Sequence, residues 1–133
     1  MNMRIPIFTL CDYAQSNGGK LNIIGTFSRI IAEKFPLKYS PALYVVARVT
    51  SVEPCEGVFE FTVSDSDGKS IMKPLEGKFK IDDPQHSDQE KAFDFTVAIN
   101  NQIFEKPGAY IFKFKIGDVE ATQTLYLEQK VLE

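Results

Sequence analysis

The side chains best suited to catalysis in this sequence are one histidine and two cysteines. His86 lies in the polar run of residues 83–88, Asp-Pro-Gln-His-Ser-Asp, which predicts an exposed loop. An imidazole in solvent has no neighbouring group to orient it toward a nucleophile, so we expect no catalytic triad. Cys11 lies in an apolar segment and Cys55 close to two glutamates, and neither setting lowers the pKa of a thiol. We therefore expect no catalytic residue; a hydrolase that uses His86 is one alternative.

Acidic residues in two polar connections are the type of oxygen ligand that Ca²⁺ takes. These candidates are Asp65, Asp67, Asp82, Asp83 and Asp88. Some β-domains gather such loops at one end to bind the ion, but the EF-hand pattern fails here because Lys69 occupies an acidic position. An Asp-Gly hairpin turn explains the first pair without a metal. We expect no metal or other cofactor, with a Ca²⁺-dependent ligand-binding domain as the alternative.

Polar residues also interrupt otherwise apolar segments in the first half of the chain. They are Asp12, Asn22, Arg29 and Arg48. A carboxylate inside an apolar strand is costly unless it is hydrogen-bonded or paired. We expect Asp12 to accept hydrogen bonds from the turn at residues 17–20, or to pair with Arg29 or Arg48. Our interpretation is a structural polar latch, and a binding-site acid is the alternative.

The elements that must position these side chains are β-strands. Apolar and polar residues alternate through most of the second half, and residues 17–20 and 67–68 carry the glycines that hairpin turns require. A length of 133 residues fits one domain. About eight strands with turns at roughly ten-residue spacing predict an all-β domain over residues 1–133. The predicted architecture is a two-sheet antiparallel β-sandwich, immunoglobulin-like or C2-like, and a closed barrel is the alternative.

Strands in the first half are apolar on both faces, in residues 5–13, 21–31 and 43–49. Two layers cover only one face of each sheet, so an apolar patch would remain that soluble monomers seldom expose. The interface candidates are Phe8, Leu10, Ile24, Ile30, Tyr44 and Val46. Two-fold pairing into a homodimer would cover them. Alternatively, residues 33–41 or 127–132 fold over the patch.

Charge and cysteine content bear on partners and compartment. The 15 Lys and Arg against 18 Asp and Glu give a net charge of −3, so we expect neither nucleic acid nor an anionic membrane as a partner. Residues 1–15 lack the pattern of a secretory signal. We therefore expect a cytoplasmic, reducing setting in which both cysteines are free thiols.

Two segments near the start resemble a family of small bacterial proteins of unknown function. Residues 9–15 read Thr-Leu-Cys-Asp-Tyr-Ala-Gln, and residues 19–27 read Gly-Lys-Leu-Asn-Ile-Ile-Gly-Thr-Phe. Further family-like elements are Pro-Leu-Glu-Gly at 74–77 and Phe-Glu-Lys-Pro-Gly-Ala-Tyr-Ile-Phe at 104–112. The resemblance implies a fold and a bacterial origin, but no activity. The last element is also similar to a strand entry of immunoglobulin-like domains, where Tyr110 would tie its hydroxyl back to the preceding turn.

These observations favour a non-catalytic function. We expect a binding or assembly module whose surface engages another protein or a second copy of the chain.

Overall fold

The structure, a computed structural model, describes residues 3–131, with Pro84 through its backbone alone. Within this range the chain forms β-strands and a single-turn 3₁₀ helix, η1 (Pro84–His86), so the expected all-β class is confirmed. The strands are β1 (Arg4–Asn17), β2 (Lys20–Thr26), β3 (Arg29–Ala32), β4 (Leu37–Tyr39), β5 (Leu43–Ser51), β6 (Cys55–Ser64), β7 (Leu75–Ile81), β8 (Lys91–Ile99), β9 (Gln102–Phe104), β10 (Gly108–Ile116) and β11 (Val119–Gln129).

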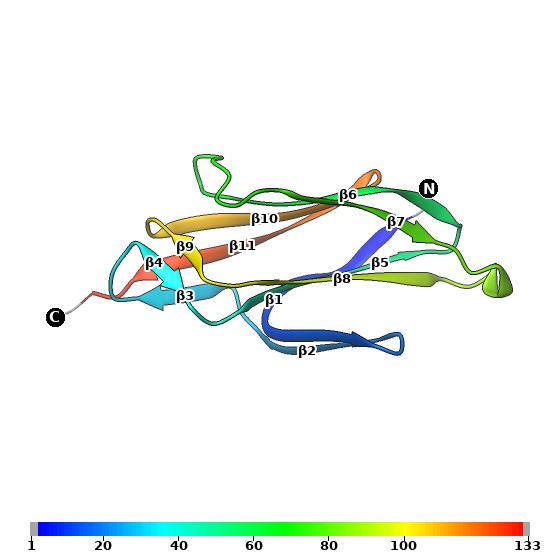
Figure 1. The fold of residues 1–133 in the computed structure, drawn as a ribbon, viewed down its shortest axis with the longest axis horizontal. Coiled ribbons are helices and arrows are strands. Elements are labelled where there is room, and N and C mark those ends of the chain that lie inside the picture. The colour runs from blue at the N-terminus through cyan, green and yellow to red at the C-terminus, as the bar shows by residue number, and fades with distance from the viewer. Residues whose placement is uncertain (1–2, 132–133) are drawn as a thin grey trace.

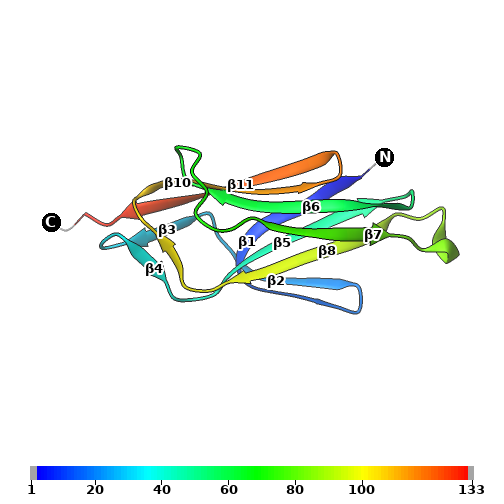
Figure 2. The same cartoon turned by 45° about the horizontal axis from the view of Figure 1, so that its top comes forward.

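The strands form three sheets. One has the order β2-β1-β5-β8, a second has the order β3-β11-β10-β6-β7, and the third is the short pair β4-β9. Neighbouring strands are antiparallel except β3 and β11, which run parallel. The two larger sheets face each other, and β4-β9 lies toward the end where residue 131 is found (Figures 1 and 2).

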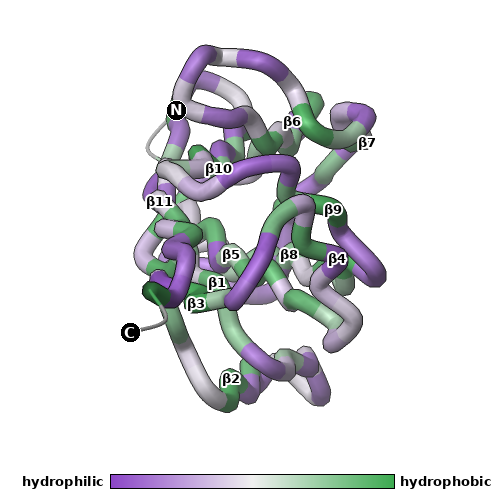
Figure 3. Tube along the Cα trace, turned by 90° about the vertical axis from the view of Figure 1, so that its left-hand side faces the viewer, coloured by the Kyte–Doolittle hydropathy of each residue, from purple (hydrophilic) through white to green (hydrophobic). Residues whose placement is uncertain are grey.

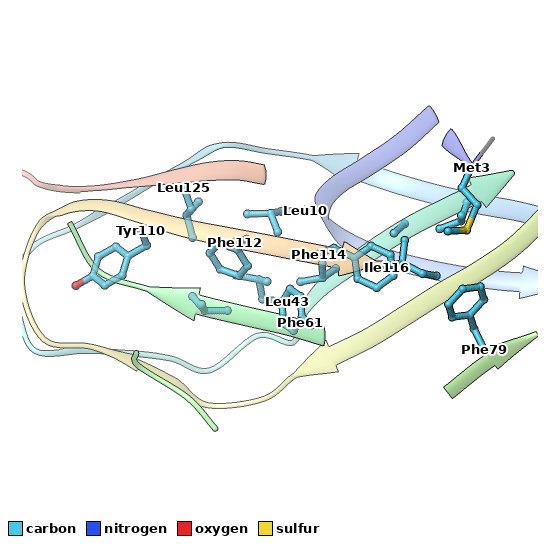
Figure 4. Packing of buried hydrophobic residues seen from close by; sticks show 14 of the residues in the cluster. Met3, Leu10, Leu43, Phe61, Phe79, Tyr110, Phe112, Phe114, Ile116 and Leu125 are labelled. Carbon is cyan, nitrogen blue, oxygen red and sulfur yellow. The ribbon is translucent and has the colours of Figure 1, made fainter. Parts of the chain in front are cut away.

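Aromatic rings fill the space between the two larger sheets. Phe61, Phe112 and Phe114 project from one sheet toward Leu10 and Leu43 of the other, and all five are fully buried (Figure 4). Phe61, Phe112 and Phe114 lie on the apolar parity of β6 and β10, so the alternation in these two strands correctly indicates the inward face, whereas β1 and β5 are apolar on both parities. The core is continuous along the length of the sheets.

The strand count exceeds the expected eight, because three short strands lie in segments that the sequence analysis assigned otherwise. Residues 21–31 were expected as one strand but divide into β2 and β3 on either side of residues 27–28. β4 lies inside the connection at residues 33–41, and β9 follows the tight turn at Asn100 and Asn101, where Asn101 has a φ of 56°. Strands of three or four residues are too short to show a period-two pattern.

Tyr110 fixes the turn that precedes its own strand, as the similarity of this segment to an immunoglobulin-like strand entry implies. Its hydroxyl donates to the carbonyl oxygen of Lys106 at 2.6 Å, and its ring is buried against Phe104. The tyrosine therefore anchors the 106–109 turn at the edge of the core.

Two glycines in β6 and β7 make room for core rings from the opposite strand. Gly77 is paired with Phe59, and Gly57 is paired with Phe79. A Cβ atom on Gly77 would lie 2.5 Å from the Phe59 ring, whereas one on Gly57 would lie 3.2 Å from the Phe79 ring. Phe59 cannot swing away freely because it packs against Phe93, Phe95 and Phe114.

We predict that Gly77→Ala lowers the free energy of unfolding by about 1–3 kcal/mol, the usual cost of overpacking a core. Gly57→Ala is the matched control and should cost less, because its ring has more room. Urea denaturation of both variants measures the difference. Equal stability of Gly77→Ala and the unaltered protein would contradict the packing described here.

Candidate functional site

The most unusual feature of the fold is that β1 turns back on itself. Its first half pairs with β5 as far as Cys11, and its second half pairs with β2 (Figure 1). The hairpin formed by residues 12–26 then runs back beneath the outer face of β5 and β8, so that β2 forms an additional layer when the molecule is viewed along its long axis (Figure 3). We call this segment the folded-back hairpin.

The folded-back hairpin covers the apolar outer face of β5. Cys11, Ala14 and Val46 form a second buried cluster, separate from the main core, and Leu21, Ile23 and Tyr44 pack around it. This cluster explains why the first half of the sequence is apolar on both parities: one face of β5 faces the main core and the other faces the hairpin. Intramolecular cover is therefore provided by residues 12–26 rather than by the segments at 33–41 or 127–132, of which residue 132 lies outside the described range.

An ion pair holds the tip of the folded-back hairpin on the sheet. Arg48 of β5 donates two hydrogen bonds to Asp94 of β8, at 2.7 and 2.8 Å, and a third to the carbonyl oxygen of Gly19 at 3.2 Å. Ser16 donates to the same carboxylate at 3.2 Å. The side chains of Arg48 and Asp94 are only 24% and 10% exposed. The hydrogen bonds from Arg48 hold the pKa of Asp94 below its usual value, against the opposing effect of burial.

Of the four residues expected to form a polar latch, Arg48 alone takes part in this arrangement, and its partners are Asp94 and the Gly19 carbonyl oxygen. Arg29 pairs instead with Glu128 at 3.1 Å on the surface, and Asn22 is exposed. Asp12 is exposed with its carboxylate directly against Gly25, whose φ of 70° and lack of a Cβ permit this contact. Among residues 3–131 no hydrogen bond or ion pair to the Asp12 carboxylate is formed, so the expected pairing of Asp12 with the turn or with an arginine is wrong.

We predict that Asp94→Ala loosens the hairpin and lowers the free energy of unfolding by about 1–3 kcal/mol, since it leaves a largely buried guanidinium unpaired. The folded-state pKa of Asp94 is depressed. Its contribution is therefore present above the unfolded pKa of about 3.9 and is lost as pH falls through the lower folded value.

Unfolding experiments between pH 7 and pH 2 check this prediction. Asp94→Asn should show a flatter loss of stability at acidic pH than the unaltered protein. Lys106→Ala, which removes only an exposed ion pair with Asp67, is the control. If the free energy of unfolding falls equally with decreasing pH in Asp94→Asn and in the unaltered protein, the Arg48–Asp94 pair does not stabilise the fold.

Most of the six interface candidates are covered within the chain. Leu10 is fully buried in the main core, and Phe8 and Ile30 pack against that core. Val46 is fully buried beneath the hairpin, where Tyr44 lies beside it. Of the six, Ile24 alone is largely exposed, at 62%. Phe8 and Leu10 were expected to point outward, but both point inward. A bulge between Arg4 and Ile7 shifts the alternation of β1 by one residue and so turns these two side chains toward the core.

The acidic candidates for Ca²⁺ do not meet. Asp65 and Asp67 precede β7, whereas Asp82, Asp83 and Asp88 follow it, so the two groups lie at opposite ends of that strand. Asp65 accepts hydrogen bonds from the backbone N–H groups of Asp67 and Lys69, both at 2.9 Å, in a tight turn. Within residues 3–131 no group of three or more His, Cys, Asp or Glu side chains is placed to hold a metal ion.

We predict that neither CaCl₂ nor EGTA changes the melting temperature, because the turn at Asp65 is held by its own backbone. Differential scanning calorimetry with MgCl₂ as the control salt measures this. A rise in melting temperature with CaCl₂ but not with MgCl₂ would overturn the prediction.

His86 lies beside Asp83 at the surface. The two side chains are 2.7 Å apart and about half exposed, and the contact lowers the pKa of Asp83. They line a shallow cleft of about 350 Å³ with residues of β7, β8 and their connection. No serine, threonine or cysteine of the described residues lines this cleft. The arrangement therefore supplies an acid–base pair without a nucleophile beside it.

Both cysteines are free thiols, as expected, and both are buried. Burial raises the pKa of Cys11, which keeps the thiol protonated and unreactive. Cys55 belongs to the main core and Cys11 to the cluster beneath the hairpin.

Comparison with known proteins identifies the family. Residues 6–126 match the model of a family of unknown function, DUF6941. The chain belongs to this family. No curated protein matches it in sequence. The fold of this DUF6941 chain is similar to a part of the beta-glucosidase from Listeria innocua, whose crystal structure contains gluconolactone, with a TM-score of 0.50 and 10% identity. The match covers 95% of the DUF6941 chain but only 16% of the glucosidase chain, and it shows the fold alone.

The described part of the DUF6941 chain leaves one extended surface exposed on the hairpin. Tyr13 and Ile24 are paired across β1 and β2 and are 42% and 62% exposed; the Tyr13 ring also contacts Tyr44 of β5, with ring centroids 5.2 Å apart. Beside them, the outer edge of β2 pairs with no other described strand. Sequence analysis identified Ile24 but missed the free edge, because only the pairing order shows that β2 ends a sheet. In residues 3–131, no helix has the length and apolar character required to cross a membrane.

Proposed function

We propose that this chain is a non-catalytic binding or assembly module that engages another protein, or a second copy of itself, through the folded-back hairpin. The observation that carries the proposal is the free outer edge of β2 beside the exposed side chains of Ile24 and Tyr13. An unpaired strand edge offers backbone donors and acceptors to an added strand, and adjacent apolar side chains give that strand a surface to pack against.

A binding role also agrees with the way the hairpin is held. The ion pair of Arg48 and Asp94 and the cluster around Val46 fix its inner face, so its outer face and edge are presented on a rigid support. A preformed edge loses little conformational entropy when a partner binds. We interpret the two facing sheets and the Tyr110 turn as an immunoglobulin-like or C2-like β-sandwich, and we propose a cytoplasmic, bacterial setting that agrees with the two free thiols.

The proposal is tested with immobilised protein exposed to an extract of the native host. Ile24→Asp places a charge on the exposed surface without disturbing a buried side chain, and we expect it to abolish capture of the partner. Val58→Asp is the matched control, because Val58 is equally exposed, at 65%, on β6 of the other large sheet. Capture that survives Ile24→Asp, or that is lost equally in Val58→Asp, would contradict a hairpin site.

A further inference from the structure

The backbone of β2 presents a defined set of free groups at its outer edge. Gly18 and Gly19 form a two-residue turn with φ values of 60° and 78°, and Asn17 and Lys20 pair across it. In such a hairpin the closing pair is hydrogen-bonded, and alternate residues beyond it bond to the same neighbour. The N–H and C=O groups of Leu21 and Ile23 therefore point away from β1 and toward the open edge.

The other sheet edges are protected in ways that β2 is not. β3 has four residues, and β4 and β9 have three each. β7 carries Lys78 and Lys80, and β8, the other edge of the sheet that contains β2, carries Lys91 and Asp94; these two edges lie in contact with each other. The second half of β1 exposes the charge of Asp12. By contrast, β2 has seven residues and a single charge, at Lys20. Proteins usually block a long edge with lysine, proline or a bulge, so an edge left open at its centre is a place for another strand.

We infer that β2 pairs antiparallel with β2 of a second copy of this chain, about a two-fold axis at Asn22. This inference rests on the proposed function and names a second copy of the chain as the partner that binds to the β2 edge. The sequence of the edge is symmetric about that residue: Leu21 and Ile23 flank it, and both carry free backbone groups. In this register Leu21 of each copy forms a hydrogen-bonded pair with Ile23 of the other, so the free groups of both residues are used.

The side chains on the outer face agree with this register. Asn22 faces Asn22 of the second copy in a pair without backbone hydrogen bonds, where side chains lie closest and the two amides can bond to each other. Ile24 faces Lys20 of the second copy, whose aliphatic stem covers the exposed isoleucine. The two Lys20 charges lie at opposite ends of the paired strands.

A cysteine at the two-fold axis tests the register directly. The two Cα atoms of such a pair lie about 4.5 Å apart, within the range that a disulfide spans. We expect purified Asn22→Cys to form a covalent dimer of twice 15.0 kDa under mild oxidation. Ile24→Cys and Val58→Cys are equally exposed controls and should stay mainly monomeric, because neither residue lies beside its own copy.

Sedimentation equilibrium of the purified protein measures the association without a crosslink. Two seven-residue strands bury less than the 1,200–2,000 Å² typical of stable interfaces, so we expect a reversible dimer that grows with concentration. Ile24→Lys should reduce the mass to 15.0 kDa, because it places a second ammonium group opposite Lys20 of the other copy, whereas Val58→Lys should leave the dimer intact.

The outcomes separate this inference from the proposed function. A purified protein that stays at 15.0 kDa at the highest soluble concentration, with Asn22→Cys no more crosslinked than Val58→Cys, would overturn the second copy as occupant. Capture of a host protein that still depends on Ile24 would then retain the hairpin site with a different partner. A dimer that is insensitive to Ile24→Lys and does not crosslink at residue 22 would overturn both the register and the surface.

Discussion

The need to cover both faces of β5 determines the arrangement of the N-terminal half. Leu43, Val45, Ala47 and Val49 face the main core, and Val46 on the other parity is just as deeply buried. A strand in a two-layer protein would leave that second face to water at a cost that scales with its apolar area. In this chain the folded-back hairpin removes the face from water.

Several local features permit that reversal. Gly25 adopts a positive φ where Asp12 lies against it, and Gly18 and Gly19 close the hairpin tightly. The tip then lies over Arg48, whose guanidinium joins β5, β8 and the hairpin through Asp94 and the Gly19 carbonyl. The same reversal presents β2 as the end of a sheet. The exposed edge that we propose as a docking surface is therefore a consequence of covering β5.

The sequence predicted the second half of the fold better than the first, for a physical reason. Strands with one wet face, such as β6 and β10, alternate clearly, and their inward phenylalanines form the core as expected. Strands buried on both faces carry no parity signal, so the orientation of Phe8 and Leu10 could not be assigned. The bulge in β1 that turns them inward cannot be recognised in a segment whose two faces are both apolar.

The candidate site shows the same limit. Arg48 was recognisable because a charge in an apolar strand needs a partner, but Asp94 looks like any outward residue of an alternating strand. Only the register of β5 with β8, which pairs the two residues directly, brings them together. The Ca²⁺ alternative would require the acidic residues of the two loops to meet, and the length of β7 separates them. Residue types thus indicated which groups need partners, whereas long-range pairing decided which partners they have.

The central claim, that residues 12–26 lie on the outer face of β5, is tested most directly by methyl NMR spectroscopy. We expect nuclear Overhauser effects from the methyl groups of Leu21 and Ile23 to those of Val46, and protection of Val46 from a water-soluble paramagnetic reagent. The exposed methyl groups of Val58 should broaden strongly in the same sample and serve as the internal reference. Absence of the contacts, with Val46 broadened as strongly as Val58, would show that the hairpin does not cover β5.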